Sequence, residues 1–508
     1  MPICWCLSLH FRQWRFISLN SLSSQSNLAK PYFFSTFPSS PPSDQTPTTQ
    51  SLVSTAVSIL THHRSKSRWS YLRSLCPNGF EPNEFSKITI DLKNNPHLAL
   101  RFFLWTQQKS LCNHNVSSYS TIIHVLARGR LKSHAQDIIR TAIRASKLEG
   151  CDGEDQSASK PLKVFETLVK TYKDCGSAPF VFDLLIKACL GSKKVDPSIE
   201  IVRMLQSRGI SPKVSTLNSL ICGVCRCHGV DAGYAIYREL FGLDTEFETS
   251  VRRVVRVRPN VHTFNALMLC FHGDGSVDKV EEIWNEMAKL DCARNSYSYT
   301  VLMAAYCEEG RMGQAEKLWQ EMKSKGMEPG LVTYNTIIGG FCKTGEIRRA
   351  EEFFRDMSLG GTDSTSATYE HLIEGHCNVG DVDSALLVYK DMCRRALRPE
   401  TSTLDMIIGI LCDKGRIHDA LEFMRSARSD FGISPKGKSY TALIKGLCNE
   451  GKMEEALKLQ AEMVGKGFEP NSEIYGAFIG GYVRQGNEEV AGALRKEMLE
   501  SQMQEKES

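Results

Sequence analysis

Glycine recurs along the second half of this chain at an almost constant spacing. Seven glycines follow one another at steps of 35 residues, with one step of 36: Gly275, Gly310, Gly345, Gly380, Gly415, Gly451 and Gly486. Alanine lies five residues after six of these glycines, and methionine lies twelve residues after six of them. A period of this length is typical of a solenoid, in which each repeat buries its apolar face against its neighbours.

One period contains the pattern of a helical hairpin. In residues 331–365, apolar side chains from Tyr334 to Phe341 follow the i, i+3, i+4, i+7 spacing of an amphipathic helix. Gly345 then supplies a residue that can adopt positive φ and end the helix. A second apolar stripe, from Ile347 to Met357, predicts a second helix antiparallel to the first. The fold expected is an all-α solenoid of antiparallel helical hairpins.

The junctions between hairpins carry two further marks. Proline ends several periods, at Pro329, Pro399, Pro435 and Pro470. A hydroxyl residue precedes the first aromatic or apolar residue of the next helix, and we expect it to cap that helix: Thr263, Ser298, Thr333, Thr368, Thr403 and Ser439. These marks divide residues 179–508 into nine repeats: 179–213, 214–260, 261–295, 296–330, 331–365, 366–400, 401–436, 437–471 and 472–506.

The pattern weakens towards the N-terminus. Residues 82–178 are interpreted as degenerate helical repeats, and residues 44–81 as a linker followed by a weakly fitting cap. The repeat 214–260 is longer than the others because of an insertion at 242–258, in which arginines alternate with valines. An insertion in a repeat usually forms a surface loop. The alternative reading of this segment is a basic arm that contacts RNA.

The first 43 residues contain no Asp or Glu but ten serines and scattered basic residues. This composition is typical of an organellar transit peptide. We expect import into mitochondria, with the chloroplast as the alternative destination and an uncleaved tail as the alternative structure.

Composition excludes several classes of protein. The chain has no run of 18 apolar residues, so no membrane span is expected. The formal net charge of +4 gives no argument for nucleic acid by itself. No phosphate-binding loop, nucleophile elbow or His-Glu-x-x-His helix is present, so we expect no enzyme and no cofactor.

The cysteines could suggest a metal site. The cluster of Cys222, Cys225, Cys227 and His228 has a spacing that zinc sites use. Cysteine, however, recurs at one place of the repeat, which a small buried thiol on an apolar helix face explains: Cys225, Cys307, Cys342, Cys377, Cys412 and Cys448. The interpretation is therefore packing, with no metal.

Residues 332–345 read Val-Thr-Tyr-Asn-Thr-Ile-Ile-Gly-Gly-Phe-Cys-Lys-Thr-Gly and resemble the opening of a pentatricopeptide repeat. Residues 299–310 and 440–451 are similar, and the register extends over 179–506. The chain is most similar to plant members of the P class, because it has no His followed two residues later by Glu, as a C-terminal deaminase-like domain requires. The resemblance implies a right-handed superhelix whose first helices line a concave face, where single-stranded RNA lies with one base per repeat.

In that family the fifth and the last residue of each repeat read the base. The resemblance carries this role to five pairs. Three of them would read pyrimidines: Asn218 with Asn260, Asn265 with Asn295, and Asn335 with Thr365. Thr300 with Gly330 would read a purine, and Thr441 with Asn471 would read adenine. Val332 is the best match to the residue that sandwiches a base. Three pairs depart from the pattern and are expected to read no base: Asp183 with Lys213, Glu370 with Glu400, and Asp405 with Lys436.

The function expected is that of a sequence-selective RNA-binding protein, acting without catalysis in mitochondrial RNA stabilisation, processing, splicing or translation. Its partner would be single-stranded organellar RNA, bound by a monomer. The alternative is a scaffold that grips protein partners in an organellar ribosome or processing complex. The nearly neutral charge and the repeats that depart from the pattern favour this alternative.

Overall fold

The structure is a computed structural model that describes residues 49–62, 67–145, 156–243 and 257–507. Within these ranges every regular element is an α-helix, so the expected all-α class is confirmed. The expected transit peptide, residues 1–43, lies outside the described residues, as do residues 244–256 of the insertion.

The chain divides into two compact units, residues 1–274 and 275–508. Helices of the first unit are α2 (Thr49–His62), α3 (Ser67–Leu75), α4 (Pro82–Asp91), α5 (Pro96–Gln108), α6 (Val116–Arg128), α7 (Lys132–Ala145), α8 (Gln156–Thr171), α9 (Val181–Gly191), α10 (Val195–Ser207), α11 (Val214–His228), α12 (Val230–Phe241) and α13 (Val261–Gly273). Helices of the second are α14 (Val277–Lys289), α15 (Ser296–Glu308), α16 (Met312–Ser324), α17 (Leu331–Thr344), α18 (Ile347–Leu359), α19 (Ser366–Asn378), α20 (Val382–Arg394), α21 (Thr401–Asp413), α22 (Ile417–Phe431), α23 (Gly437–Asn449), α24 (Met453–Gly465), α25 (Ser472–Arg484) and α26 (Glu488–Glu507).

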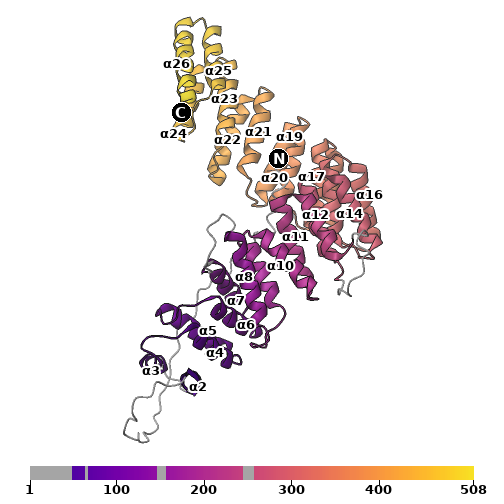
Figure 1. Ribbon diagram of the computed structural model, residues 1–508. Coiled ribbons are helices and arrows are strands. Elements are labelled where there is room, and N and C mark those ends of the chain that lie inside the picture. Colours follow the sequence, from indigo (N-terminus) through magenta and orange to yellow (C-terminus); the bar gives the residue numbers. More distant parts are fainter. Residues whose placement is uncertain (1–48, 63–66, 146–155, 244–256, 508) are drawn as a thin grey trace, which may run out of the picture. The chain divides into compact units, whose positions relative to one another are not determined.

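Within the second unit the helices form consecutive antiparallel hairpins, which Figure 1 shows as a stack of helix pairs. Each first helix packs on its own second helix and also on the next first helix, as α17 does with α18 and α19. First helices therefore form one continuous layer within this unit, and second helices lie beside them. The predicted solenoid of helical hairpins is confirmed.

The periodic glycines end the first helices, as predicted. All seven have positive φ, between 71° and 81°. At Gly345 the backbone is left-handed with φ 81°, and its N–H bonds back to the carbonyls that end α17. An L-residue rarely adopts this conformation, so the spacing of the glycines reflects the spacing of helix ends.

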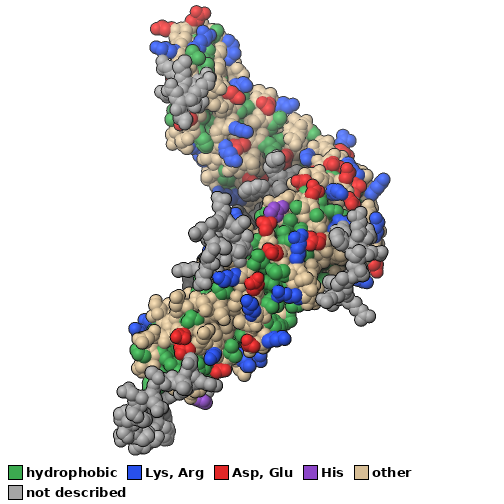
Figure 2. Space-filling view, in the orientation of Figure 1, with side chains coloured by type: hydrophobic (Ala, Val, Ile, Leu, Met, Phe, Trp, Pro, Cys, Tyr) green, Lys and Arg blue, Asp and Glu red, His purple; other side chains and the backbone are tan. Residues whose placement is uncertain are grey.

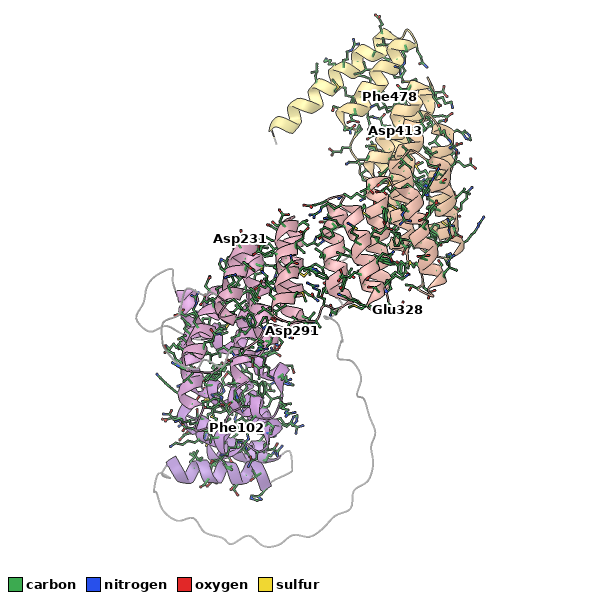
Figure 3. All side chains as sticks on the ribbon, turned by 90° about the vertical axis from the view of Figure 1, so that its right-hand side faces the viewer. Phe102, Asp231, Asp291, Glu328, Asp413 and Phe478 are labelled. Carbon is green, nitrogen blue, oxygen red and sulfur yellow. The ribbon has the colours of Figure 1, made fainter. Side chains whose placement is uncertain are left out.

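The core follows the predicted stripes. Tyr334, Ile338 and Phe341 are all buried on α17, and Ala350 and Met357 are fully buried on α18. Toward the C-terminus, Phe478 (Figure 3) is buried on α25.

Cysteines of the repeat pack against glycines of the next first helix. A Cβ added at Gly340 would lie 2.6 Å from Cys307 Sγ, and one at Gly375 would lie 2.8 Å from Cys342 Sγ. Five of the six periodic cysteines are buried, and Cys412 is half-buried. The packing role predicted for them is confirmed.

The prediction for the helix caps was wrong in one respect. The first helices start two residues before the hydroxyl residues, which occupy the third helical position. The N-cap is instead the last residue of the preceding repeat, such as Asn260, Asn295 or Thr365. In these three cases the hydroxyl accepts the N–H of the N-cap residue, which completes a capping box.

A second contact joins the two helices of several hairpins. The hydroxyl of Tyr440 donates to Glu462 at 2.8 Å, and Lys466 donates to the same hydroxyl at 2.7 Å. Tyr299 makes the same contacts with Glu321 and Lys325. These side chains lie 22 and 26 residues apart, so the contact fixes the end of the second helix against the start of the first.

Candidate functional site

The fifth and the last residue of a repeat come from different helices. The fifth lies one turn into a first helix, and the last is the N-cap of the next first helix. Because adjacent first helices pack on one another, the two residues can meet at the start of each helix pair. The hydroxyl residue at the third helical position lies between them.

Asn218 and Asn260 meet in this way. The amide of Asn218 lies 3.4 Å from Asn260 Oδ1 and 2.8 Å from the hydroxyl of Thr263. Asn260 Oδ1 also accepts the N–H of Thr263 at 3.0 Å, which caps α13. The candidate reading pair is thus held by the same contacts that start the helix.

Asn335 and Thr365 are joined through Thr368. The Thr368 hydroxyl donates to Asn335 Oδ1 at 2.8 Å and lies 3.3 Å from the Thr365 hydroxyl. Val332, the candidate sandwiching residue, is half-buried one turn before Asn335 on α17. Thr368 therefore brings Asn335 and Thr365 together, while Val332 lies one turn away on the same helix.

Thr441 and Asn471 line one cavity of about 450 Å³. The Thr441 hydroxyl donates to the carbonyl of Gly437 at 3.1 Å, which leaves its lone pairs as acceptors. Asn471 Oδ1 accepts the N–H of Ile474 at 3.1 Å, which caps α25. Its amide nitrogen is not used in that cap, so the exposed Asn471 side chain keeps two donors for a ligand.

Two other candidates are covered by their neighbours. Thr300 is 3% exposed, and its hydroxyl lies 2.8 Å from that of Thr333. Gly330, its partner residue, caps α17 without a side chain. Asn265 is 4% exposed on α13. Asn295 is the N-cap of α15 in the second compact unit, where its Oδ1 accepts the N–H of Ser298 at 2.9 Å.

The three acidic fifth residues have a structural role that sequence reasoning missed. Each carboxylate accepts the backbone N–H of the last residue of its own repeat: Asp183 from Lys213 at 2.9 Å, Glu370 from Glu400 at 3.0 Å, and Asp405 from Lys436 at 3.0 Å. The Asp405 carboxylate also accepts the hydroxyl of Ser439 at 2.6 Å.

These acids compensate for missing caps. Lys213, Glu400 and Lys436 are the N-caps of α11, α21 and α23, and none of their side chains caps its helix. The carboxylate from the preceding first helix satisfies the backbone N–H at that position instead. The signal was present in the sequence, because an acid at the fifth place coincides with Lys or Glu at the last.

Acidic side chains also cluster on α19. Burial, more than the nearby Glu400, raises the pKa of Glu370 to about 7. Burial likewise raises the pKa of Glu374, one turn further along the helix. Ionised carboxylates at this place oppose the approach of a polyanion, which agrees with the expectation that this repeat reads no base.

Charge on the molecular surface is mixed. On the face drawn in Figure 2, Lys and Arg side chains are interspersed with Asp and Glu rather than gathered in one patch. Among the described residues, no three His, Cys, Asp or Glu side chains converge as metal ligands. The same residues include no helix with the length and apolar character that a membrane crossing requires.

The stacked hairpins and their repeated junctions define a class of helical-repeat protein. The family model of the pentatricopeptide repeat matches residues 259–307, 294–334, 329–378, 364–413 and 435–473, and a second model of this repeat matches residues 473–503. Residues 259–413 and 435–503 of the chain therefore consist of pentatricopeptide repeats.

Relatives agree with this assignment. A pentatricopeptide repeat-containing protein of Arabidopsis thaliana is 53% identical over 251 residues, which are 49% of this chain and 48% of that protein. A second Arabidopsis thaliana protein of this kind, named as mitochondrial, is 24% identical over 184 residues, or 36% of this chain and 33% of that protein. The chain therefore spans about half or less of the length of these relatives.

Among solved structures, the pentatricopeptide repeat protein PPR10 from maize is similar over 90% of this chain and 80% of its own, with 16% identity and a TM-score of 0.43.

Proposed function

We propose that this protein binds single-stranded RNA sequence-selectively and without catalysis, as a monomer. The observation that carries the proposal is the recurring junction between adjacent first helices. Asn218 with Asn260, and Asn335 with Thr365, meet there through one shared hydroxyl, while Thr441 and Asn471 share a cavity. Amide and hydroxyl groups at such positions suit the hydrogen-bonding edges of unstacked bases.

The proposed target follows the order of the repeats from 214 to 471. It contains two pyrimidines, a purine and a further pyrimidine, then two unread bases and an adenine. The unread positions correspond to Glu370 and Asp405, whose carboxylates cap the following helix. The buried Thr300 and Asn265 would contribute less selectivity than the exposed Asn471.

We further propose that the site of action is the mitochondrion. The acid-free N-terminal 43 residues and the mitochondrial relative support this location, with the chloroplast as the alternative. There the bound protein would stabilise a transcript or guide its processing, splicing or translation.

The test uses the full chain and a fluorescently labelled oligonucleotide of the proposed pattern. Anisotropy titrations should give tighter binding to this oligonucleotide than to one with purines and pyrimidines exchanged, and equal affinities would refute the proposal. Thr441→Asn should shift the preference at the last read position from adenine towards pyrimidine. The matched control oligonucleotide is changed only at an unread position. This change should leave the affinity unaltered for the wild-type protein and for Thr441→Asn.

A protein-binding scaffold is the second candidate. The half-buried carboxylates Glu370 and Glu374, the fifth-place acids and the mixed surface charge favour it. Crosslinking in organelle extract separates the two functions. Labelled RNA recovered with the protein supports the first, and polypeptides that stay bound after nuclease treatment support the second.

A further inference from the structure

The cavity lined by Thr441 and Asn471 is also lined by two lysines, Lys438 and Lys445. On α23 the residues Lys438, Thr441 and Lys445 are spaced by three and four positions, so they share one face of the helix. Both lysines line the cavity and are exposed. A nucleotide held by Thr441 and Asn471 would therefore have Lys445 one helical turn away.

Glycines flank Lys445 at the same register of both neighbouring first helices. Gly409 on α21 and Gly480 on α25 each lie at the ninth place of their repeats, as Lys445 does. A Cβ added at Gly409 would meet no atom within 4 Å, and one at Gly480 would meet only the guanidinium of Arg484 at 3.9 Å. Space is therefore open at the ninth place of the first helix on each side of α23.

Two carboxylates line the same cavity but lie at other registers. Asp413 (Figure 3) is one turn beyond Gly409, at the end of α21, and Glu473 lies at the start of α25. Among the described residues, no ion pair joins Lys445 to either of them. Lys445 is the one cation at the ninth place in the second compact unit, where the other repeats have Ala304, Gly339, Glu374, Gly409 and Gly480.

We propose that Lys445 binds a backbone phosphate of the RNA, next to the base held by Thr441 and Asn471. The ammonium group is a compact charge on a flexible stem, which neutralises a phosphate without a fixed geometry. The two glycines leave room for the ribose and phosphate on either side. This inference rests on the proposed RNA-binding function and adds a contact that carries no sequence information.

Salt dependence distinguishes such a contact from base reading. For single-stranded nucleic acid, each phosphate neutralised contributes about 0.7 to the slope of log affinity against log salt concentration. Loss of one contact in Lys445→Gln should therefore lower the affinity ratio of wild type to variant by about 2.6-fold between 50 and 200 mM salt. The loss should be the same for every oligonucleotide, whatever base faces Thr441.

The experiment compares the full chain with two charge-matched variants in anisotropy titrations over this salt range. Lys458→Gln is the control, because Lys458 is an exposed lysine on α24, the second helix of the same repeat. The proposal predicts a smaller slope for Lys445→Gln and an unchanged slope for Lys458→Gln. Equal slopes in the two variants, or an effect of Lys445→Gln confined to one base, would overturn it. If the wild-type chain binds no RNA, the proposed function itself fails, which is a different result.

Discussion

The sharpest test of this structure concerns the carboxylate at the fifth place of a repeat, which accepts the N–H at the start of the next first helix. Asp405 on α21 accepts the N–H of Lys436 at 3.0 Å and the hydroxyl of Ser439 at 2.6 Å, and both donors belong to the start of α23. Replacing Asp405 with Ala removes Oδ1, the oxygen that accepts both hydrogen bonds, and leaves the first turn of α23 without a cap, because the Lys436 side chain supplies none. The change should loosen the junction between two repeats and leave the interior of each hairpin intact.

The magnitude follows from two known effects. Loss of an N-cap acceptor costs ~0.5–2 kcal/mol. A hydrogen bond to a charged acceptor contributes ~1.5–3 kcal/mol, and the half-buried position of Asp405 places the effect in the lower part of that range. We expect Asp405→Ala to lower the free energy of local opening by about 2 kcal/mol, which increases the open population roughly 30-fold. Asp405→Asn keeps one neutral acceptor and should lose about half of that energy.

Hydrogen exchange measures this directly, because unfolding of a repeat array need not be two-state. Peptides that cover 436–441 should exchange faster in Asp405→Ala, whereas peptides from α17 should not change. Asp413→Ala is the matched control on the same helix, since Asp413 is exposed at the C-terminal end of α21. The reasoning is refuted if protection at 436–441 is the same in wild type and Asp405→Ala, or if Asp413→Ala has the same effect.

Two further predictions concern titration and the hairpin contacts. Burial raises the pKa of Glu370 in the folded state to about 7, above its ordinary value of 4.5, so the protonated side chain favours folding and the ionised one opposes it. The free energy of unfolding measured by chemical denaturation should therefore fall as pH rises through 7. Glu370→Gln should remove this fall. Tyr440→Phe removes the hydroxyl that contacts Glu462 and Lys466 and should cost about 1 kcal/mol in the same assay. Tyr334→Phe should change the midpoint much less, since the Tyr334 hydroxyl makes no comparable contact in the described residues, and equal shifts in the two variants would contradict the assignment.

The fold was predictable because its determinants are local and repeated. Positive φ at Gly345 and its equivalents, the buried stripe of α17 and the packing of Cys342 against Gly375 all depend on residues within one or two repeats. Periodicity multiplies each of these weak signals, so the hairpin and its register emerge from the sequence alone. Which residue capped each first helix was less predictable, because Thr368 and the other hydroxyl residues suit both the N-cap and the third helical position.

The sequence predicts the positions of the candidate site residues but not their exposure, because exposure depends on contacts between repeats. Position in the repeat identifies Asn335 and Asn265 equally, but burial separates them, because Asn335 is half-buried and Asn265 is 4% exposed. Exposure of a fifth residue depends on the side chains that pack around it, which the spacing of residues does not encode. The same holds for the cavity at Lys445, whose lining combines residues of α21, α23 and the start of α25, which belong to three successive repeats.

Capping and base reading use the same residue, and this limits what each junction can recognise. An Asn at the last place engages its oxygen with a backbone N–H, as Asn471 does with Ile474, and keeps its two amide hydrogens for a base. When Lys or Glu stands there, the cap must come from elsewhere, and an acid at the fifth place provides it. The remaining carboxylate oxygen can only accept hydrogen bonds, so the acid cannot offer a base the donors that an Asn amide offers. A repeat of this kind therefore couples its neighbours mechanically, and selectivity should concentrate in repeats that cap themselves with Asn.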